Sequence, residues 1–145
     1  MSEKALSLND KNYDVWNNLV ICYDWLKLPE KSAEARGRLL VLLEQAIKTN
    51  PQDANAHATL AAEYAVMHEK EKTLSHVQTT LALTPDDPIN LLSVADAYEL
   101  MGDRRQAVVY IERALKHGLK ADEVRGDPYM QSILKDPALK SSLKR

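Results

Sequence analysis

The sequence predicts an all-α chain built from a repeated pair of helices, and three observations support this prediction. Apolar residues recur every three or four positions in successive segments, as they do on one face of a helix. Prolines stand between these segments, where helices begin or end. Residue types also recur after 34 positions, the interval from Pro51 to Pro85 and from Tyr64 to Tyr98.

The apolar spacing predicts helices within residues 54–67, 74–83, 91–101 and 108–115. No segment alternates apolar and polar residues as a half-buried strand would. The 34-residue interval relates the first two helices to the last two. The corresponding residues include Leu60 and Val94, Ala61 and Ala95, and Leu81 and Leu115.

A further copy of the helix pair precedes these two and is longer. Tyr23 lies 41 residues before Tyr64, whereas Ala46 lies 34 residues before Thr80. Seven extra residues therefore fall between the two helices of the first copy, at residues 27–33. The proline and polar residues of that stretch favour an elongated turn, with part of the extra length added to the second helix.

These copies resemble the tetratricopeptide repeat (TPR) family. Its 34-residue unit carries Trp-x₂-Leu-Gly-x₂-Tyr in the first helix and Ala-x₃-aromatic in the second. The resemblance covers about residues 13–118, and Val20 stands where the motif of the first copy would have glycine. We expect the matching first-helix residues to form the core of the repeats: Trp16, Leu19, Tyr23, Leu60, Tyr64, Val94 and Tyr98.

The resemblance implies a TPR-type α-solenoid, in which antiparallel helix pairs stack into a right-handed superhelix with C-terminal capping helices. We expect three repeats, at residues 13–53, 54–87 and 88–118. Residues 1–12 are expected to end the second helix of a preceding repeat. A solenoid does not naturally begin with half a repeat, so we expect the chain to be the C-terminal piece of a longer protein.

Residues 119–145 are expected to form a C-terminal cap of two short helices, near 129–134 and 138–144. Asp127-Pro128 and Asp136-Pro137 each place an aspartate at an N-cap and a proline at the first helical position. An ending of this kind resembles the tail of repeat arrays in bacterial signalling proteins.

Composition and charge exclude several classes of protein. The 19 Lys and Arg residues and 21 Asp and Glu residues give a net charge of −2, which disfavours a strongly basic nucleic-acid binder. The longest aliphatic run, residues 39–43, is too short to span a membrane. The single cysteine, Cys22, excludes an internal disulfide and is expected to be a small buried thiol. Because no signal-peptide core is visible, we expect a cytoplasmic protein.

Catalytic motifs are absent from the sequence. It contains no phosphate-binding glycine loop, no His-Glu-x-x-His and no Gly-x-Ser-x-Gly. His57 occupies the usual tryptophan position of its repeat and is expected to pack between helices. His68 and His76 flank a charged turn and are expected to lie in solvent. We therefore expect no enzyme, no cofactor and no metal site.

A binding function fits the resemblance better, because the first helices of TPR units line a concave groove that holds peptides. Aligning the first helices gives the groove candidates, whose central part is rich in small residues and whose rim is acidic. These candidates are Asn17, Ile21, Asp24, Asn55, Ala58, Thr59, Ala62, Ala65, Leu92, Ser93, Asp96 and Glu99.

These groove positions also indicate the kind of partner. Chaperone-binding members of the family clamp peptide carboxylates with lysine and arginine. No Lys or Arg occurs at the groove positions, so we expect no carboxylate-clamp ligand. An apolar protein segment that carries basic residues suits the acidic rim better. The alternative is that these acids only solvate a face that packs against neighbouring repeats.

We therefore expect a non-catalytic protein–protein interaction module, acting as the regulatory arm of a larger protein. One alternative is a structural module that mediates self-assembly, since residues 1–100 are net acidic and residues 101–145 net basic. A less favoured alternative is a nucleic-acid adaptor that uses the basic residues around the last repeat. Those residues are Arg104, Arg105, Arg113, Lys116, Lys120 and Arg125.

Overall fold

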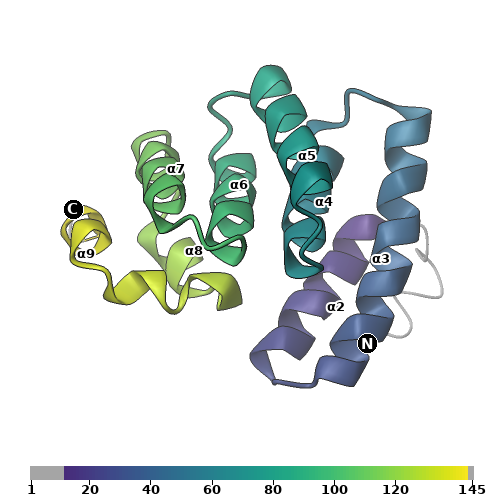
Figure 1. The fold of residues 1–145 in the computed structure, drawn as a ribbon, viewed down its shortest axis with the longest axis horizontal. Coiled ribbons are helices and arrows are strands. Elements are labelled where there is room, and N and C mark those ends of the chain that lie inside the picture. The colour runs from purple at the N-terminus through teal and green to yellow at the C-terminus, as the bar shows by residue number, and fades with distance from the viewer. Residues whose placement is uncertain (1–11, 144–145) are drawn as a thin grey trace. The chain divides into compact units, whose positions relative to one another are not determined.

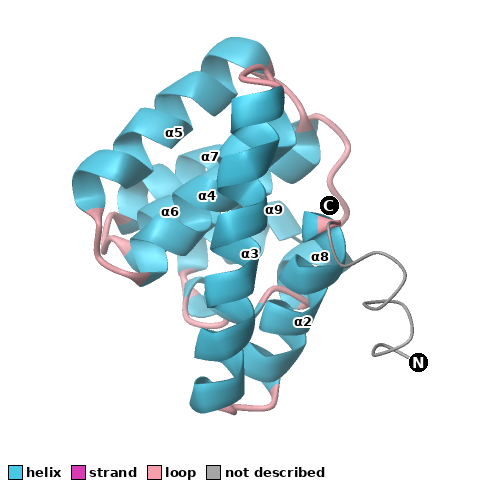
Figure 2. Cartoon of the chain, turned by 90° about the vertical axis from the view of Figure 1, so that its right-hand side faces the viewer, coloured by secondary structure: helices cyan, strands magenta, loops and turns pink. Residues whose placement is uncertain are grey.

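A computed structural model describes residues 12–143, and all regular secondary structure within them is helical (Figures 1 and 2). The chain divides into two compact units, Met1–Pro51 (unit 1) and Gln52–Arg145 (unit 2), and each is described by itself. None of the described helices is both long enough and apolar enough to cross a membrane. The expected end of a preceding repeat at residues 1–12 lies outside the described residues, except for Asn12.

From residue 12 onward, unit 1 is a single helix pair of α2 (Tyr13–Trp25) and α3 (Pro29–Thr49). The side chain of Asn12 caps α2 by accepting a hydrogen bond from the backbone N–H of Asp14 at 2.9 Å. Pro29 opens α3, at a position where its missing N–H costs no hydrogen bond. Helices α2 and α3 pack against each other, and Val20 on α2 and Leu39 and Leu43 on α3 are fully buried.

The seven extra residues of the first copy lengthen helix α3 and do not form an elongated turn. Helix α3 has 21 residues and its counterpart α5 has 14, whereas the turn before α3 has only three, Leu26, Lys27 and Leu28. Seven residues make about two helical turns, so the apolar stripe of the helix stays in phase across the insertion. The buried residues on that stripe are Ser32, Ala35, Leu39, Leu42 and Leu43.

Unit 2 contains two further helix pairs. The first is α4 (Ala54–Val66) with α5 (Lys70–Leu83), and the second is α6 (Pro88–Leu100) with α7 (Arg104–Lys116). Each pair packs along its length, and α4 also packs against α6 (Figure 1). The N-caps of three of these helices are aspartates whose carboxylates accept backbone hydrogen bonds, namely Asp53, Asp87 and Asp103. The predicted all-α fold of packed antiparallel helix pairs is thus confirmed within each unit.

The same turn joins the two helices of each pair. The residue after the cap position has a positive φ in all three turns: 56° at Lys27, 62° at His68 and 85° at Gly102. The backbone N–H that follows donates to a tyrosine carbonyl in the last turn of the first helix. The three bonds are Leu28 to Tyr23 at 3.0 Å, Glu69 to Tyr64 at 2.9 Å and Asp103 to Tyr98 at 2.9 Å. The aligned tyrosines therefore also mark where each first helix ends.

The C-terminal part of unit 2, residues 121–143, is called the cap. It consists of α8 (Ala121–Arg125), the 3₁₀ turns η1 (Pro128–Met130) and η2 (Ile133–Lys135), and α9 (Pro137–Leu143). Where one helix was expected near 129–134, the structure has two 3₁₀ turns. This segment begins at Asp127-Pro128 and ends at Asp136-Pro137, and each Asp-Pro pair starts a new helical turn. The segment between them is too short for a regular α-helix.

Apolar packing joins the cap to the last helix pair. Met130, Ile133 and Leu139 of the cap are fully buried, in one cluster with Leu91 of α6 and Ile111 of α7. Leu134 and Leu143 pack against this cluster from its edge. The end of the second helix pair in unit 2 is therefore covered by residues of the same chain.

Candidate functional site

The predicted repeat-core residues occupy two kinds of position. Leu60 and Val94 are fully buried, whereas Tyr64 and Tyr98 are half-buried at the edge between the two helices of their pairs. Tyr98 stacks on Tyr110 of α7, with ring centres 5.5 Å apart and ring planes 3° apart. Tyr64 stacks in the same way on His76 of α5, at 5.6 Å and 16°. In unit 1, the side chains of Trp16, Leu19 and Tyr23 are half-buried.

His76 does not lie free in solvent as the sequence predicted. Its Nδ1 atom lies 2.9 Å from Nδ1 of His57, which is buried on α4, and the ring centres are 5.1 Å apart. A hydrogen bond between two such nitrogens needs one N–H and one lone pair, so one ring donates and the other accepts. His68, in contrast, is exposed in the turn. In residues 12–143 no three His, Cys, Asp or Glu side chains gather in a way that could hold a metal ion.

Cys22 also differs from its prediction, because the structure places it at the surface of α2. It lies two residues after the buried Val20, a spacing that carries its side chain away from the α2–α3 contact. Its exposure removes the expected packing role.

The predicted groove residues of unit 2 lie on the first helices α4 and α6, and we call these positions the first-helix face. Their exposure varies along the face. Ala58, Thr59, Ala62, Ala65 and Asp96 are buried, with at most 8% of their surface exposed. Four positions are half-buried: Asn55, Leu92, Ser93 and Glu99.

In unit 1 the predicted groove residues Asn17, Ile21 and Asp24 are all half-buried on α2. Asp24 is not a free acid, because Arg36 of α3 binds its Oδ2 atom at 3.1 Å. The hydroxyl of Ser32 donates a short hydrogen bond to the other carboxylate oxygen. Asp24 therefore ties α2 to the inserted turns of α3.

Glu99 is held in a similar way by an arginine from the second helix of its pair. Arg104 donates from Nε and Nη2 to the two carboxylate oxygens of Glu99, at 2.7 and 2.6 Å. The same guanidinium reaches the cap, where it contacts Asp136 at 3.5 Å and the Ser132 hydroxyl at 3.1 Å. This two-pronged geometry is the strong form of an Arg–carboxylate pair.

Asp96, the third acid of the predicted rim, faces the cap and not solvent. Its side chain is hydrogen-bonded to that of Asp127, and both residues are 8% exposed. Burial, and then repulsion from Asp127, Glu63 and Glu99, raises the pKa of Asp96 well above its usual range. Burial also raises the pKa of Asp127, although its bonds from Asp96 and from the N–H of Tyr129 oppose the shift.

The charged residues that the sequence placed on a rim and in a basic patch are therefore largely engaged within the chain. Asp24 and Glu99 are paired with arginines, and Asp96 is paired with a second carboxyl group. Of the basic patch, Arg104 is bound as above, Arg113 binds Asp86 at 3.1 Å, and Arg125 binds Asp122 at 2.9 Å. This pairing weakens the acidic-rim interpretation, whereas Arg105, Lys116 and Lys120 of the basic patch are exposed.

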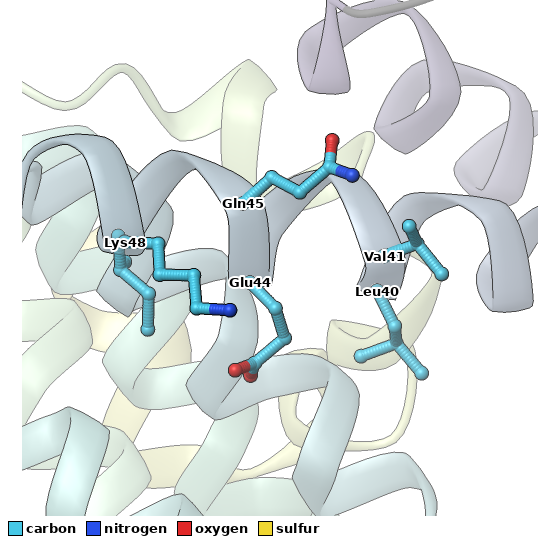
Figure 3. A pocket seen from close by; sticks show the side chains of 6 residues that line it. Leu40, Val41, Glu44, Gln45 and Lys48 are labelled. Atoms are coloured by element: carbon cyan, nitrogen blue, oxygen red, sulfur yellow. The ribbon is translucent and has the colours of Figure 1, made fainter.

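Depressions at the surface of unit 1 include two along helix α3. One, of about 480 Å³, lies between α2 and α3 and is lined by Trp16, Leu19, Tyr23, Lys31, Glu34, Ala35 and Arg38. The Arg38 guanidinium lies over the Trp16 ring, 6.0 Å from its centre. The other, of about 600 Å³, follows α3 (Figure 3) and is lined by Leu40, Val41, Glu44, Gln45, Ile47 and Lys48. Neither depression gathers the residue types of a catalytic site.

Comparison with known proteins adds little to this description. Neither a family model nor a curated protein matches the sequence. Among the solved structures that match is a crystal structure of MamA, which is 24% identical. The match covers 80% of this chain and 84% of the MamA chain, with a TM-score of 0.42.

Proposed function

We propose that this chain is a non-catalytic protein-interaction module that binds a protein or peptide segment on the first-helix face. The observation that carries the proposal is the direct packing of α4 against α6, two helices with the same 34-residue register. Equivalent positions such as Thr59 and Ser93 are thereby repeated along one surface. A surface built from packed helices is ordered before a ligand arrives, so binding costs little ordering of the receptor.

The composition of this face supports an apolar segment as the ligand. Leu92 offers a half-buried apolar contact on this face. Asn55 and Ser93 supply hydrogen-bonding groups beside it. The pairing of Glu99 with Arg104 removes much of the attraction for basic residues that the sequence indicated. We propose that such a module serves as the regulatory arm of a larger protein.

A peptide selection tests this function. The protein is used to select binders from a random peptide library, and their affinities are measured by fluorescence anisotropy. We expect apolar-rich peptides whose affinity falls at least tenfold in Ser93→Arg, because a bulky cation would obstruct the face. The matched control is Gln78→Arg on the exposed side of α5, which should leave affinity unchanged. Failure to select binders, or equal losses in both variants, would contradict the proposal.

A second candidate function is self-assembly, and it is favoured by the tip of unit 1. The turn between α2 and α3 exposes Trp25, Leu26 and Leu28 by 44%, 66% and 38%. The equivalent turns of unit 2 are Met67-His68-Glu69 and Met101-Gly102-Asp103, so each carries one apolar residue where the turn of unit 1 carries two. Exposed apolar clusters of this kind often mark contact surfaces. Gel filtration across a concentration series should show dimers that disappear in Leu26→Asp; a monomer at all concentrations excludes this function.

A further inference from the structure

Two buried carboxyl groups join the cap to the last helix pair. Asp96 lies on α6, and Asp127 lies in the loop between α8 and η1. Each is 8% exposed, and their side chains are hydrogen-bonded to each other. A carboxyl group can donate a hydrogen bond only when it is protonated. The contact therefore holds one proton between two elements that are 31 residues apart in the chain.

The surroundings of this pair strongly favour its protonated form. The charged groups that act on Asp96 are Asp127, Glu63 of α4 and Glu99 of α6, all of them acidic. The nearby cation Arg104 of α7 is bound to Glu99 and to Asp136. Asp127 accepts the backbone N–H of Tyr129 at 2.9 Å. Loss of the proton would leave two negative charges side by side in a buried position.

The hydrogen bonding of Asp96 is consistent with a protonated pair. Its Oδ1 atom is buried and accepts no hydrogen bond from the described residues. An unpaired carbonyl oxygen of a neutral acid is a moderate cost, whereas an unpaired oxygen of a buried carboxylate is a large one.

The apolar part of the cap's attachment does not depend on pH, and the ion pair of Arg104 with Asp136 adds to it. Met130, Ile133 and Leu139 are held by apolar packing against Leu91 and Ile111, and this packing has no titratable group. Ionisation of the carboxyl pair therefore makes opening of the cap more frequent without removing the cap altogether.

We propose that the Asp96–Asp127 pair is a proton-dependent latch, so that the cap opens away from α6 more often as the pH rises from acid toward neutral. Each opening exposes the two acids to water, where the shared proton leaves at any pH above about 4. The closed state keeps the proton to higher pH because burial and neighbouring acids raise the pKa of Asp96. Between a pH of about 4 and the raised pKa of the closed state, the opening constant of the cap rises by up to about tenfold per pH unit, because one proton is released per opening.

Hydrogen exchange of the whole chain between pH 5 and 7.5 tests the latch. Exchange rates of the hydrogen-bonded amides of Met130, Asp136 and Leu139 are divided by their intrinsic rates at each pH, which gives the opening constant of the cap. We expect this constant to increase several-fold per pH unit. The opening constant of the cap amides should also exceed the opening constant of the α4 amides at every pH, as a local opening of the cap requires.

Asp96→Asn is the decisive variant, because its amide can donate to Asp127 without a titrating proton. We expect its cap opening constant to change less than twofold across the range. Asp127→Asn offers the same test from the other side, and asparagine can still cap η1. A pH dependence that persists in both variants, or equal opening constants in the cap and in α4, would overturn the proposal.

Discussion

The helix pairs α4–α5 and α6–α7 are two copies of one repeated helix pair. They differ most in what their first helices contact. Leu60 and Val94, and likewise Ala61 and Ala95, are fully buried at equivalent positions. The turns between the helices have the same hydrogen bonds and a positive φ at the same place. These shared positions determine how two helices pack, and the buried ones hold residues of similar size in both copies.

Other positions of the same two helices have diverged. Ala62 of α4 corresponds to Asp96 of α6, and Ala65 corresponds to Glu99. On α6 these positions hold acids that bind Asp127 and Arg104, whereas on α4 they remain small. The comparison shows that positions outside the repeat core adapt to the next element of the chain, which for α6 is the cap.

The largest effect should come from the shared buried positions. We expect Leu60→Ala to reduce the free energy of unfolding by about 3 kcal/mol, through lost apolar burial and the cavity left behind. Val94→Ala at the equivalent site removes fewer atoms and should cost about half as much. Urea denaturation measures both, with Ile89→Ala as the control because Ile89 is 49% exposed. A cost at Leu60 no larger than that at Ile89 would contradict the shared register.

The stacked rings should give the next largest effect. We expect Tyr98→Ala to cost about 2–3 kcal/mol, since it removes a half-buried ring and its contact with Tyr110. Tyr64→Ala should cost a similar amount through His76. Tyr98→Phe keeps the ring and should stay within about 1 kcal/mol of the wild type. Thermal unfolding of the four proteins provides the comparison, and costs below 1 kcal/mol for both alanines would rule out a core role for these rings.

The divergent position Asp96 should make overall stability depend on pH. Its pKa is raised in the folded protein, so its stabilising proton is fully present below about pH 4 and is lost as the pH rises through the folded-state pKa. The unfolding free energy should therefore fall with increasing pH, by up to about 1.4 kcal/mol per pH unit from this group. Urea denaturation of the wild type and Asp96→Asn from pH 5 to 8 measures the difference between them. If the unfolding free energy depends on pH with the same slope in both proteins, Asp96 does not cause that dependence.

The smallest effects should come from the turns. His68 has a φ of 62°, so His68→Gly should stabilise the protein by about 0.5–1 kcal/mol. Gly102→Ala should destabilise by about 1 kcal/mol, and through backbone strain alone, because no atom lies within 4 Å of an added Cβ. Changes of the same sign at both positions would mean that the two turns are not equivalent.

Much of the fold could be predicted from the sequence, because repetition reveals which residues are structurally equivalent. The interval between Tyr64 and Tyr98 aligned the two first helices, and in the structure both tyrosine carbonyls accept the equivalent hydrogen bond from the turn that follows. The conformation of the insertion could not be predicted in this way. Seven residues fit either a long turn or two helical turns, and only packing of the Ser32–Ala35 face in α3 favours the helix.

The candidate site could be predicted only in part. The sequence placed Asn55, Leu92 and Ser93 on first helices, but it could not give the exposure of Asp96, which depends on the cap folding back over α6. The contact between His57 and His76 was missed for a similar reason. It joins two helices across a turn, and neither residue lies in a sequence motif that signals the pair.

Chemical-shift mapping by NMR would test the proposed interaction most directly. A peptide selected by the protein would be titrated into isotope-labelled chain, and the amide shifts of both helix pairs followed. We predict the largest changes at Asn55, Leu92 and Ser93 on α4 and α6. The strongest changes at Gln78 on α5 or Val109 on α7, with the first helices unaffected, would contradict binding on the first-helix face.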